Sequence, residues 1–391
     1  MRLLFLTDNY LPHLGGSRVY YHNLFSHLRD VDICVLTRRQ EGDLAFDRKQ
    51  SYHILRCPLE ESPRLERLHL QALPLYKNLL RYALKVARRF HPDVIAAGEL
   101  VPTGPVAATL AKLSRRPFLV FTHAEGPATI GRTRWQSKLA SWVCGQARRV
   151  IAASGNARDG LLQYQRVPWG KIEVMLPGVG EEHFDEQYAA TPCAAERRQL
   201  LSVGRLVPRK GHLVLLQALP EIVSQVPNLC LTIVGTGPLE GELRDTCRRL
   251  GLGERVRFAG RLEEKDLLRA YSQSDCFALP NSDDPETGDT EGFGIVFGEA
   301  AAHGLPAIGG VAGGTEHSIR DGVTGLRVDG CAPQAVAGAV RDVLTDPARA
   351  QAYGKAGRAM ALAEFRWPSR ASRFCEILAS ISEAKQSGAA K

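Results

Sequence analysis

The chain has 391 residues, which is too long for one ordinary hydrophobic core and predicts two domains. Its composition, 44% hydrophobic and 24% charged, excludes a disordered chain, and its 37 glycines follow no three-residue period. The net charge of +8 is uneven, because residues 1–180 hold 26 Lys and Arg against 14 Asp and Glu, whereas residues 181–391 hold 24 against 28. The basic first half favours an anionic partner, and a solvated basic face without a partner is the alternative.

The nine cysteines form no CxxC pair, and several lie in apolar runs. This pattern is typical of reduced, buried thiols in a reducing compartment and gives no indication of a zinc site. The apolar run after Met1 reaches Asp8 too soon for a signal peptide, and no run approaches the roughly 18 apolar residues of a membrane span. We therefore expect a cytoplasmic protein.

In the first half of the chain, short apolar runs that predict buried strands alternate with helical patterns. The expected strands are 3–6, 32–37, 94–97, 118–122 and 150–153, and the expected helices include 20–28, 79–90 and 137–148. The helix at 79–90 is amphipathic and basic, so it either packs on its own sheet or docks on a membrane surface.

The pattern breaks between residues 177 and 199, where we expect an interdomain linker, and a second alternation follows. Its expected strands are 199–203, 230–234, 256–258, 276–279 and 306–308, its helices are 212–223, 239–250, 264–272 and 295–303, and residues 333 to about 384 are mostly helical. The tail after residue 384 is expected to be disordered. Alternating strands and helices predict two α/β, doubly wound domains whose ligands bind at the carboxyl ends of the strands.

Three glycine-containing segments follow expected strands and precede expected helices. Gly15-Gly16 lies at a helix start that offers free N–H groups to an anion, although a plain turn explains it equally well. Two glycines in residues 204–211 (GRLVPRKG) bracket three cations, which suit a diphosphate. The Gly235-Thr236-Gly237 turn is weak evidence by itself.

Two carboxylates, Glu291 and Glu299, flank the start of an apolar helix expected near Gly294. Both side chains are therefore expected to face one cleft, where carboxylates accept hydrogen bonds from sugar hydroxyls and exposed N–H groups donate to others. Gly309-Gly310 and Gly313-Gly314 form another tight loop after the next strand.

The segments EGFGIVFGEAAAHGLPAI, GRLVPRKG and VGTGP together resemble the retaining nucleotide-sugar glycosyltransferases of the GT-B fold. The resemblance is to the group that contains glycogen-synthase-like and phosphatidylinositol-mannosyltransferase-like enzymes, and it is strongest from 199 to 330. It implies two Rossmann-like domains facing across a cleft: an acceptor-binding domain at 1–180 and a donor-binding domain at 181–365. A helix at 366–391 is expected to cross back to the first domain.

The resemblance also implies roles for individual residues. Arg205 and Lys210 match the pair that binds the nucleotide diphosphate, Glu299 matches the acid that holds the ribose hydroxyls, and Glu291 matches the acid near the transferred sugar. Gly16, with Gly15 before it, matches the glycine beside the diphosphate, and His123 matches an active-site histidine, although alone it would be read as structural. The remaining donor contacts implied are Gly235, the turn ending at Arg261 and Leu262, and the backbone of Gly292, Phe293, Gly294 and Ile295.

The reaction implied is transfer of a hexosyl group from GDP-mannose or a UDP-hexose to an acceptor hydroxyl, with retention and without a protein nucleophile. It belongs to glycolipid, polysaccharide or lipopolysaccharide synthesis, and we lean towards GDP-mannose because EGFGIVF resembles the mannosyl-transferring members. No tightly bound cofactor and no metal are expected, and Asp283-Asp284 is not a DxD motif. The acceptor is expected to be lipid-linked, phosphorylated or a saccharide, with a contact to the anionic inner face of the membrane.

Other readings are kept open. One is a sugar-nucleotide epimerase or a phosphorylase on the same architecture. Another is a non-enzymatic binder of anionic polymers, which the absence of recognisable nucleic-acid modules disfavours. The chain also has Pro177-Gly178-Val179-Gly180 where the family often has Pro-Asn-Gly-Val-Asp, a departure expected to affect the hinge rather than catalysis. The contacts of the acidic loop 281–290 cannot be read from the sequence.

Overall fold

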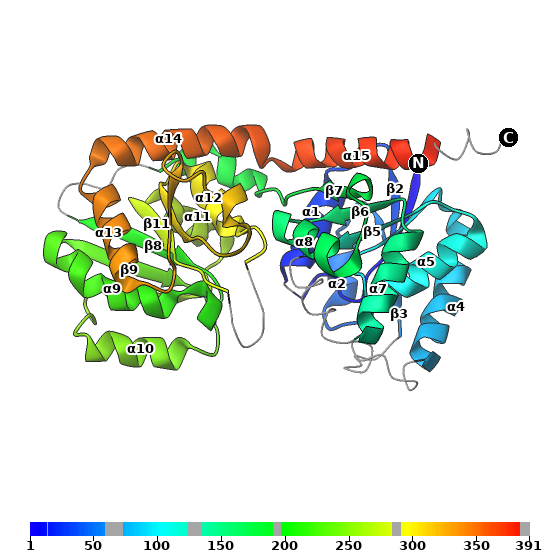
Figure 1. Cartoon of the computed structure of the whole chain (residues 1–391), viewed down its shortest axis with the longest axis horizontal. Coiled ribbons are helices and arrows are strands. Elements are labelled where there is room, and N and C mark those ends of the chain that lie inside the picture. Colours follow the sequence, from blue (N-terminus) through cyan, green and yellow to red (C-terminus); the bar gives the residue numbers. More distant parts are fainter. Residues whose placement is uncertain (14, 59–72, 124–133, 191–196, 284–290, 384–391) are drawn as a thin grey trace. The chain divides into compact units, whose positions relative to one another are not determined.

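A computed structural model describes the chain except for residues 14, 59–72, 124–133, 191–196, 284–290 and 384–391. The chain forms two compact units (Figure 1). The N-terminal unit is Met1–Pro177 together with Trp367–Lys391, and the C-terminal unit is Gly178–Arg366. Among the described residues, no helix is both long enough and apolar enough to cross a membrane. The expected disordered tail falls on residues outside the described part.

The N-terminal unit is built on a seven-stranded parallel sheet with the order β3-β2-β1-β4-β5-β6-β7. Its strands are β1 (Arg2–Leu6), β2 (Asp32–Arg38), β3 (His53–Cys57), β4 (Val94–Ala97), β5 (Phe118–Thr122), β6 (Arg149–Ala152) and β7 (Ile172–Val174). Its helices are α1 (Gly16–Ser26), α2 (Asp43–Asp47), α4 (Leu73–Phe90), α5 (Thr103–Ser114), α7 (Arg134–Gln146), α8 (Gly155–Gly160) and α15 (Trp367–Glu383).

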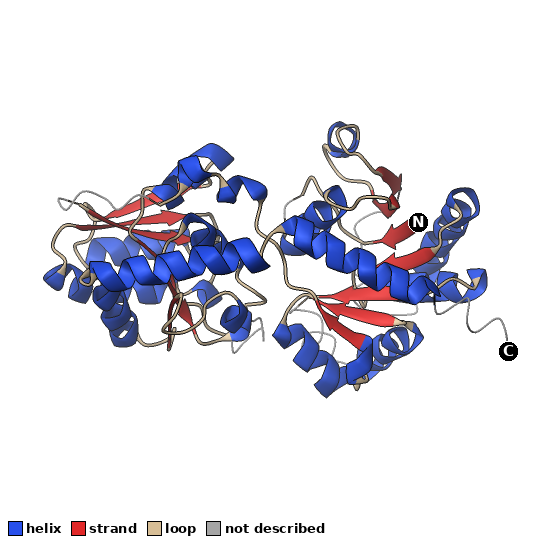
Figure 2. Cartoon of the chain, turned by 90° about the horizontal axis from the view of Figure 1, so that it is seen from above, coloured by secondary structure: helices blue, strands red, loops and turns tan. Residues whose placement is uncertain are grey.

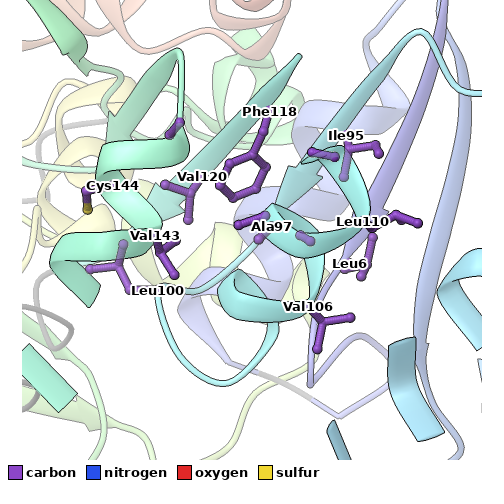
Figure 3. Packing of buried hydrophobic residues seen from close by; sticks show 14 of the residues in the cluster. Leu6, Ile95, Ala97, Leu100, Val106, Leu110, Phe118, Val120, Val143 and Cys144 are labelled. Atoms are coloured by element: carbon purple, nitrogen blue, oxygen red, sulfur yellow. The ribbon is translucent and has the colours of Figure 1, made fainter. Parts of the chain in front are cut away.

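Both faces of this sheet are buried, which is why its central strands read as continuous apolar runs. Along β1, Leu4 and Leu6 join the cluster beneath α4, α5 and α7, whereas Leu3 and Phe5 join the cluster beneath α1 and α15. Figure 3 shows the first cluster, in which side chains of β4, β5, α5 and α7 point toward one another. The helices therefore fix the sheet from two sides.

Helix α15 completes the N-terminal unit although the whole C-terminal unit precedes it in sequence (Figure 1). The Trp367 ring lies edge-on to Tyr20 at 5.4 Å between centroids, and the Phe374 ring lies 5.5 Å from Phe121. Trp367 and Phe374 are 1% and 0% exposed. The last described helix is therefore part of the core of the first unit.

The C-terminal unit has a six-stranded parallel sheet with the order β10-β9-β8-β11-β12-β13. Its strands are β8 (Arg198–Val203), β9 (Leu229–Val234), β10 (Val256–Gly260), β11 (Cys276–Leu279), β12 (Ala307–Gly310) and β13 (Gly325–Val328). Its helices are α9 (His212–Gln225), α10 (Glu240–Arg249), α11 (Glu264–Ser272), α12 (Ile295–His303), α13 (Pro333–Leu344) and α14 (Pro347–Glu364).

Helices cover both faces of this sheet as well (Figure 2). Helices α9, α10 and α13 contribute to the cluster that contains Leu200, while α11 and α12 contribute to the cluster that contains the next residue, Leu201. The prediction of two α/β units with parallel sheets is thus confirmed. The eight described cysteines are all free, and Cys331 differs from the expectation of burial because it is exposed.

The sequence analysis missed three strands, β3, β7 and β13, and each of them lies at the edge of a sheet. Their residues are mostly half-buried or exposed, so they lack the continuous apolar run that marks a central strand. Helix α4 also begins at Leu73, before the expected start at residue 79.

The segment expected to be a linker packs on the C-terminal unit in its described part. The Val179 N–H donates to the Phe365 carbonyl at 2.7 Å, and the Ala190 N–H donates to the His303 carbonyl at 2.7 Å. Phe184, in a short 3-10 helix at Glu181–Phe184, is buried. These contacts bring the start of the unit against the ends of α14 and α12.

We predict that Phe374→Ala destabilises the N-terminal unit by about 3–5 kcal/mol, because removing a fully buried ring leaves a cavity between α15 and the sheet. Thermal melting should report a lower transition temperature than in wild type. Ser372→Ala, on the exposed face of the same helix, is the control and should change stability by less than about 0.5 kcal/mol. Equal melting temperatures for the two variants would contradict the packing of α15.

A second prediction concerns His212 at the start of α9, which is 1% exposed and whose ring nitrogens have no hydrogen-bond partner among the described residues. Burial, aided by the charge of Lys210, lowers its pKa from 6.5 to about 4. Below pH 6.5 His212 is protonated in the unfolded chain but stays neutral in the folded chain. The free energy of unfolding therefore falls as the pH drops from 6.5 towards 4. The loss at pH 5 is about 2 kcal/mol.

Melting temperatures between pH 7.5 and pH 5 test this linkage. We expect His212→Phe to lose less stability on acidification than wild type does. His53→Phe, which changes an exposed histidine, should keep the wild-type pH dependence. The same slope in His212→Phe and wild type would show that His212 does not contribute.

Candidate active site

Four loops of the C-terminal unit leave the sheet at the carboxyl ends of β8, β9, β11 and β12. Because these strands are parallel, the loops meet at one edge of the sheet. They include the segments singled out in the sequence: the cations of 204–211, the turn at Gly235, and the carboxylates of 291–299.

Lys210 and Arg209 converge on the carboxylate of Glu291. The Glu291 Oε2 accepts a hydrogen bond from Lys210 Nζ and another from Arg209 Nη1 at 2.9 Å. All three side chains are largely buried, between 10% and 15% exposed. Burial disfavours the charged form of Glu291, but the two cations outweigh it and hold its pKa below the usual value. Glu291 is thus an ionised acceptor.

The backbone around Glu291 is fixed by two glycines on other segments. The Gly314 N–H donates to the Glu291 carbonyl at 2.8 Å, and a Cβ added to Gly313, whose φ is +70°, would lie 2.3 Å from that same oxygen. Gly294 also has a positive φ of +70° and caps the N-terminus of α12. Glycine is favoured at Gly294 and Gly313 by their positive φ, and at Gly313 also because the loops approach too closely for a side chain.

Glu299 lies in the second turn of α12, as expected, but in a different environment. Its Oε2 accepts a hydrogen bond from the Tyr271 hydroxyl at 2.7 Å. Burial raises its pKa, against the Tyr271 hydrogen bond and the charge of Lys210. Its side chain keeps 18% exposure. The positive charge of Lys210 favours the ionised form of both carboxylates.

Other residues singled out in the sequence do not contact Glu291 or Glu299 through their side chains. Arg205 is exposed and makes no side-chain hydrogen bond or ion pair within the described residues, whereas its neighbour Arg209, not assigned a role from the sequence, binds Glu291. The Phe293 ring is buried against Phe365, so only its backbone can serve a ligand. A Cβ on Gly235 would lie 1.9 Å from the Gly204 carbonyl, so this glycine holds two loops together.

The remaining residues that were expected to contact the donor lie around the same edge. Arg261 is exposed and Leu262 is half-buried, just after β10. Gly292 and Ile295 are also half-buried and flank the N-terminus of α12.

In the N-terminal unit, Gly15 and Gly16 form the start of α1. A Cβ added to Gly16 would meet no described atom within 4 Å, so open space lies beside this helix terminus. The free N–H groups there suit an anion.

His123 follows β5 and is held by Tyr21. The Tyr21 hydroxyl donates to the Gly98 carbonyl and lies 2.7 Å from His123 Nε2, so the Nε2–H of His123 is the donor in that second bond. Burial lowers the pKa of His123 to about 4, so the ring is neutral and its Nδ1 is an acceptor. Glu99, also in the N-terminal unit, was not assigned a role from the sequence. Its burial raises its pKa to about 7.

Among the described residues, no group of three or more His, Cys, Asp or Glu side chains is arranged to hold a metal ion. At the start of the acidic loop, Asn281 donates to the Ala312 carbonyl at 3.1 Å and accepts from the Gly310 N–H at 3.0 Å. Asp284 and the rest of the loop lie outside the described residues.

Comparisons with known proteins identify the chain's relatives. The family model described as Glycosyltransferase Family 4 matches residues 14–183, and the one described as Glycosyl transferases group 1 matches residues 184–360. A GDP-mannose-dependent alpha-(1-6)-phosphatidylinositol monomannoside mannosyltransferase of Mycobacterium tuberculosis is 36% identical over 399 residues, covering 96% of this chain and 98% of the relative. The protein of the same name from Mycolicibacterium smegmatis is 29% identical, covering 98% and 100%.

Among solved structures, Anabaena HepE in complex with UDP matches with a TM-score of 0.79 and 21% identity, covering 97% of this chain and 100% of that one. Because the match covers nearly the whole chain, it shows that both units share the fold of that structure. With the family matches and the mycobacterial relatives, it shows that the chain belongs to the GT-B glycosyltransferases.

Proposed function

We propose that this protein transfers a hexosyl group from a nucleotide diphosphate sugar, preferentially GDP-mannose, to an acceptor hydroxyl with retention at the anomeric carbon. The observation that carries this proposal is a pair of carboxylates whose pKa values are shifted in opposite directions: Glu291 is held ionised by two cations, and Glu299 accepts a hydrogen bond from Tyr271 and is 18% exposed. The printed names of the relatives support a GDP-mannose donor.

In this proposal, Lys210 and Arg205 bind the diphosphate. Glu299 accepts the ribose hydroxyls, and the contacts at Gly235, Arg261 and Leu262 border the base. Lys210 would contact both the diphosphate and Glu291. Donor binding would therefore weaken the attraction between Lys210 and the Glu291 carboxylate. Positive groups aimed at the leaving diphosphate stabilise its developing charge.

The transferred sugar is proposed to lie against the backbone of residues 292–295 and the carboxylate of Glu291. Two hydrogen-bonded cations make Glu291 a weak nucleophile, which supports a mechanism without a covalent enzyme intermediate. The bond between the anomeric carbon and the leaving diphosphate breaks, and the acceptor oxygen bonds to the anomeric carbon. The leaving phosphate oxygen takes the proton of that acceptor hydroxyl. A neutral His123, with its Nδ1 as acceptor, is suited to binding a sugar hydroxyl.

The acceptor is proposed to be lipid-linked, in keeping with the names of the mycobacterial relatives. Helix α4 supplies a basic surface for such a substrate. Its Ala83 packs in the core of the unit, while Arg81, Lys85, Arg88 and Arg89 are exposed. Since the apolar face of α4 is used inside the protein, the proposed membrane contact is electrostatic rather than an insertion.

Thermal shifts with GDP, GDP-mannose, UDP and UDP-glucose test the donor site, each with magnesium or with EDTA. At 100 times its dissociation constant, a ligand stabilises by about 2.7 kcal/mol. We expect the largest shift with the GDP ligands, unchanged by EDTA. Lys210→Ala and Glu299→Gln should weaken binding about tenfold or more, because each loses a charged hydrogen-bonding group.

Lys265→Ala and Glu242→Gln, exposed residues of the same unit, are the matched controls and should bind like wild type. Transfer of labelled mannose to a lipid extract, rather than donor interconversion or phosphate-dependent release, then separates a transferase from an epimerase or phosphorylase. Failure of every nucleotide to stabilise the protein would overturn the proposed donor site.

Vesicle sedimentation tests the membrane contact. We expect binding to vesicles containing phosphatidylinositol, little binding to neutral phosphatidylcholine, and weakening by salt. Arg81→Glu/Arg88→Glu should weaken binding at least about tenfold, since each cation near an anionic surface contributes about 1 kcal/mol. Arg248→Glu/Lys265→Glu carries the same charge change on the other unit and serves as control. Equal binding to neutral and anionic vesicles would contradict the electrostatic contact.

A further inference from the structure

All the exposed aromatic side chains among the described residues lie in the N-terminal unit. They are Tyr82 on α4, Trp135 and Trp142 on α7, Tyr164 in the short helix Leu161–Gln165, and Trp169 in the 3-10 helix Trp169–Lys171. Trp135 and Trp169 are 68% and 64% exposed, more than any other large apolar side chain that the structure describes. A single exposed apolar residue needs no explanation, but four exposed rings between residues 135 and 169 do.

The three exposed tryptophans follow one another along α7 and the turn at its end. Trp135 and Trp142 lie two turns apart, so they share the outer side of the helix. The turn that carries Trp169 is joined to the end of α7, because Lys171 Nζ donates to the Gly145 carbonyl at 2.9 Å. We call Trp135, Trp142 and Trp169 the tryptophan surface.

Cations surround the tryptophan surface. Residues 134–171 contain seven Lys and Arg against one acidic residue, Asp159, which pairs with Arg158 at 2.8 Å. The guanidinium of Arg158 also lies 5.3 Å from the centre of the Trp169 ring. Rings set among cations suit a partner that is anionic outside and apolar beneath.

A basic hollow lies at the end of α7, one turn beyond Trp142. Its volume is about 240 Å³, Gln146 lines it, and no acidic side chain does. Arg116, one of its residues, lies 3.9 Å from Asp93 outside the lining. The cations that line the hollow are Lys112, Arg115, Arg116 and Arg148. An anionic group beside the tryptophan surface would therefore meet an excess of positive charge.

The tryptophan surface lies on the same side of the sheet as the basic surface of α4. Ala83 of α4 and Val143 of α7 belong to one buried cluster, and α5 contacts both helices (Figure 1). Tyr82, the fifth exposed ring, is on α4 itself. In the C-terminal unit, none of the described aromatic side chains is exposed. This asymmetry indicates that one side of the N-terminal unit meets a partner.

A lipid surface fits these features better than a nucleic acid or a second protein. Tryptophan rings favour the boundary between lipid headgroups and acyl chains, where the ring is in apolar and the N–H in polar surroundings. Single-stranded nucleic acid is bound by rings in a basic groove, whereas Trp135 and Trp142 stand on the outer side of a helix. The centre of a protein interface is depleted of charged residues, unlike this surface.

We propose that Trp135, Trp142 and Trp169 insert their rings into the headgroup region of an anionic lipid bilayer, while the cations around them contact lipid phosphates. This inference rests on the proposed function in one respect, the lipid partner that a lipid-linked acceptor implies. It adds an apolar contact, made by a different helix, to the electrostatic contact proposed for α4. Salt screens the contact of α4, but it does not weaken the insertion of rings.

Intrinsic fluorescence tests the proposal, because three of the four tryptophans lie on this surface and the fourth, Trp367, is 1% exposed. The full-length protein is mixed with vesicles of phosphatidylcholine and phosphatidylinositol whose acyl chains carry bromine, which quenches tryptophan on contact. We expect quenching by these vesicles and none by vesicles without bromine. Part of the quenching should remain at a salt concentration that screens the contact of α4.

Trp135→Ala/Trp169→Ala should weaken vesicle binding by about tenfold or more, because two rings no longer bury apolar area in the membrane. Leu250→Ala/Leu362→Ala removes two exposed apolar side chains of the C-terminal unit and is the control. It should bind vesicles within about twofold of wild type. Melting temperatures without ligand report whether both variants are folded.

Unchanged vesicle affinity in Trp135→Ala/Trp169→Ala, or vesicle binding by wild type without bromine quenching, would overturn this inference and leave the contact of α4 standing. A wild-type protein that binds no vesicle would overturn both membrane contacts, whereas donor binding is measured without vesicles and tests the proposed function separately. If the substitutions instead dissociate an oligomer in sedimentation velocity, or abolish a gel shift with single-stranded nucleic acid, the surface serves that other partner and the inference is wrong.

Discussion

Parallel pairing of β8 with β9 and β11, and of β11 with β12, is the constraint on which the candidate site depends. It brings the ends of segments far apart in sequence to one edge of the sheet, so that Lys210 reaches the carboxylate of Glu291, 81 residues later. No local propensity produces this contact. Glycines at the crossings, such as Gly313 against the Glu291 carbonyl, let the loops approach closely enough for it.

The two carboxylates near the start of α12 have different partners and pKa values shifted in opposite directions. Glu291 precedes α12 and faces two cations, whereas Glu299 is one turn into the helix and faces a hydroxyl and the imidazole of His183. Burial opposes ionisation in both, but only Glu291 has cations hydrogen-bonded to it, so their pKa values move in opposite directions. Partner identity, rather than burial, sets the difference.

Much of the fold could be predicted because central parallel strands are buried on both faces and read as apolar runs, as in 118–122 and 276–279. Edge strands β3, β7 and β13 could not, since one of their sides faces solvent. At the site, spacing was enough to place Glu291 and Glu299 about the start of α12. Spacing could not tell which arginine of 204–211 turns toward Glu291, nor that His183 packs against α12 from 120 residues away.

The position of α15 has a consequence for how the protein is made. The apolar side of the N-terminal sheet that receives Trp367 and Phe374 is synthesised before the C-terminal unit, whereas α15, which covers it, is synthesised only after that unit. During translation, the nascent first unit therefore exposes an aromatic surface around Tyr20 and Phe121 for the time needed to make nearly 190 further residues. An exposed aromatic surface of this kind promotes aggregation and chaperone binding. The first unit is therefore prone to aggregate until α15 has been synthesised and packs on its sheet.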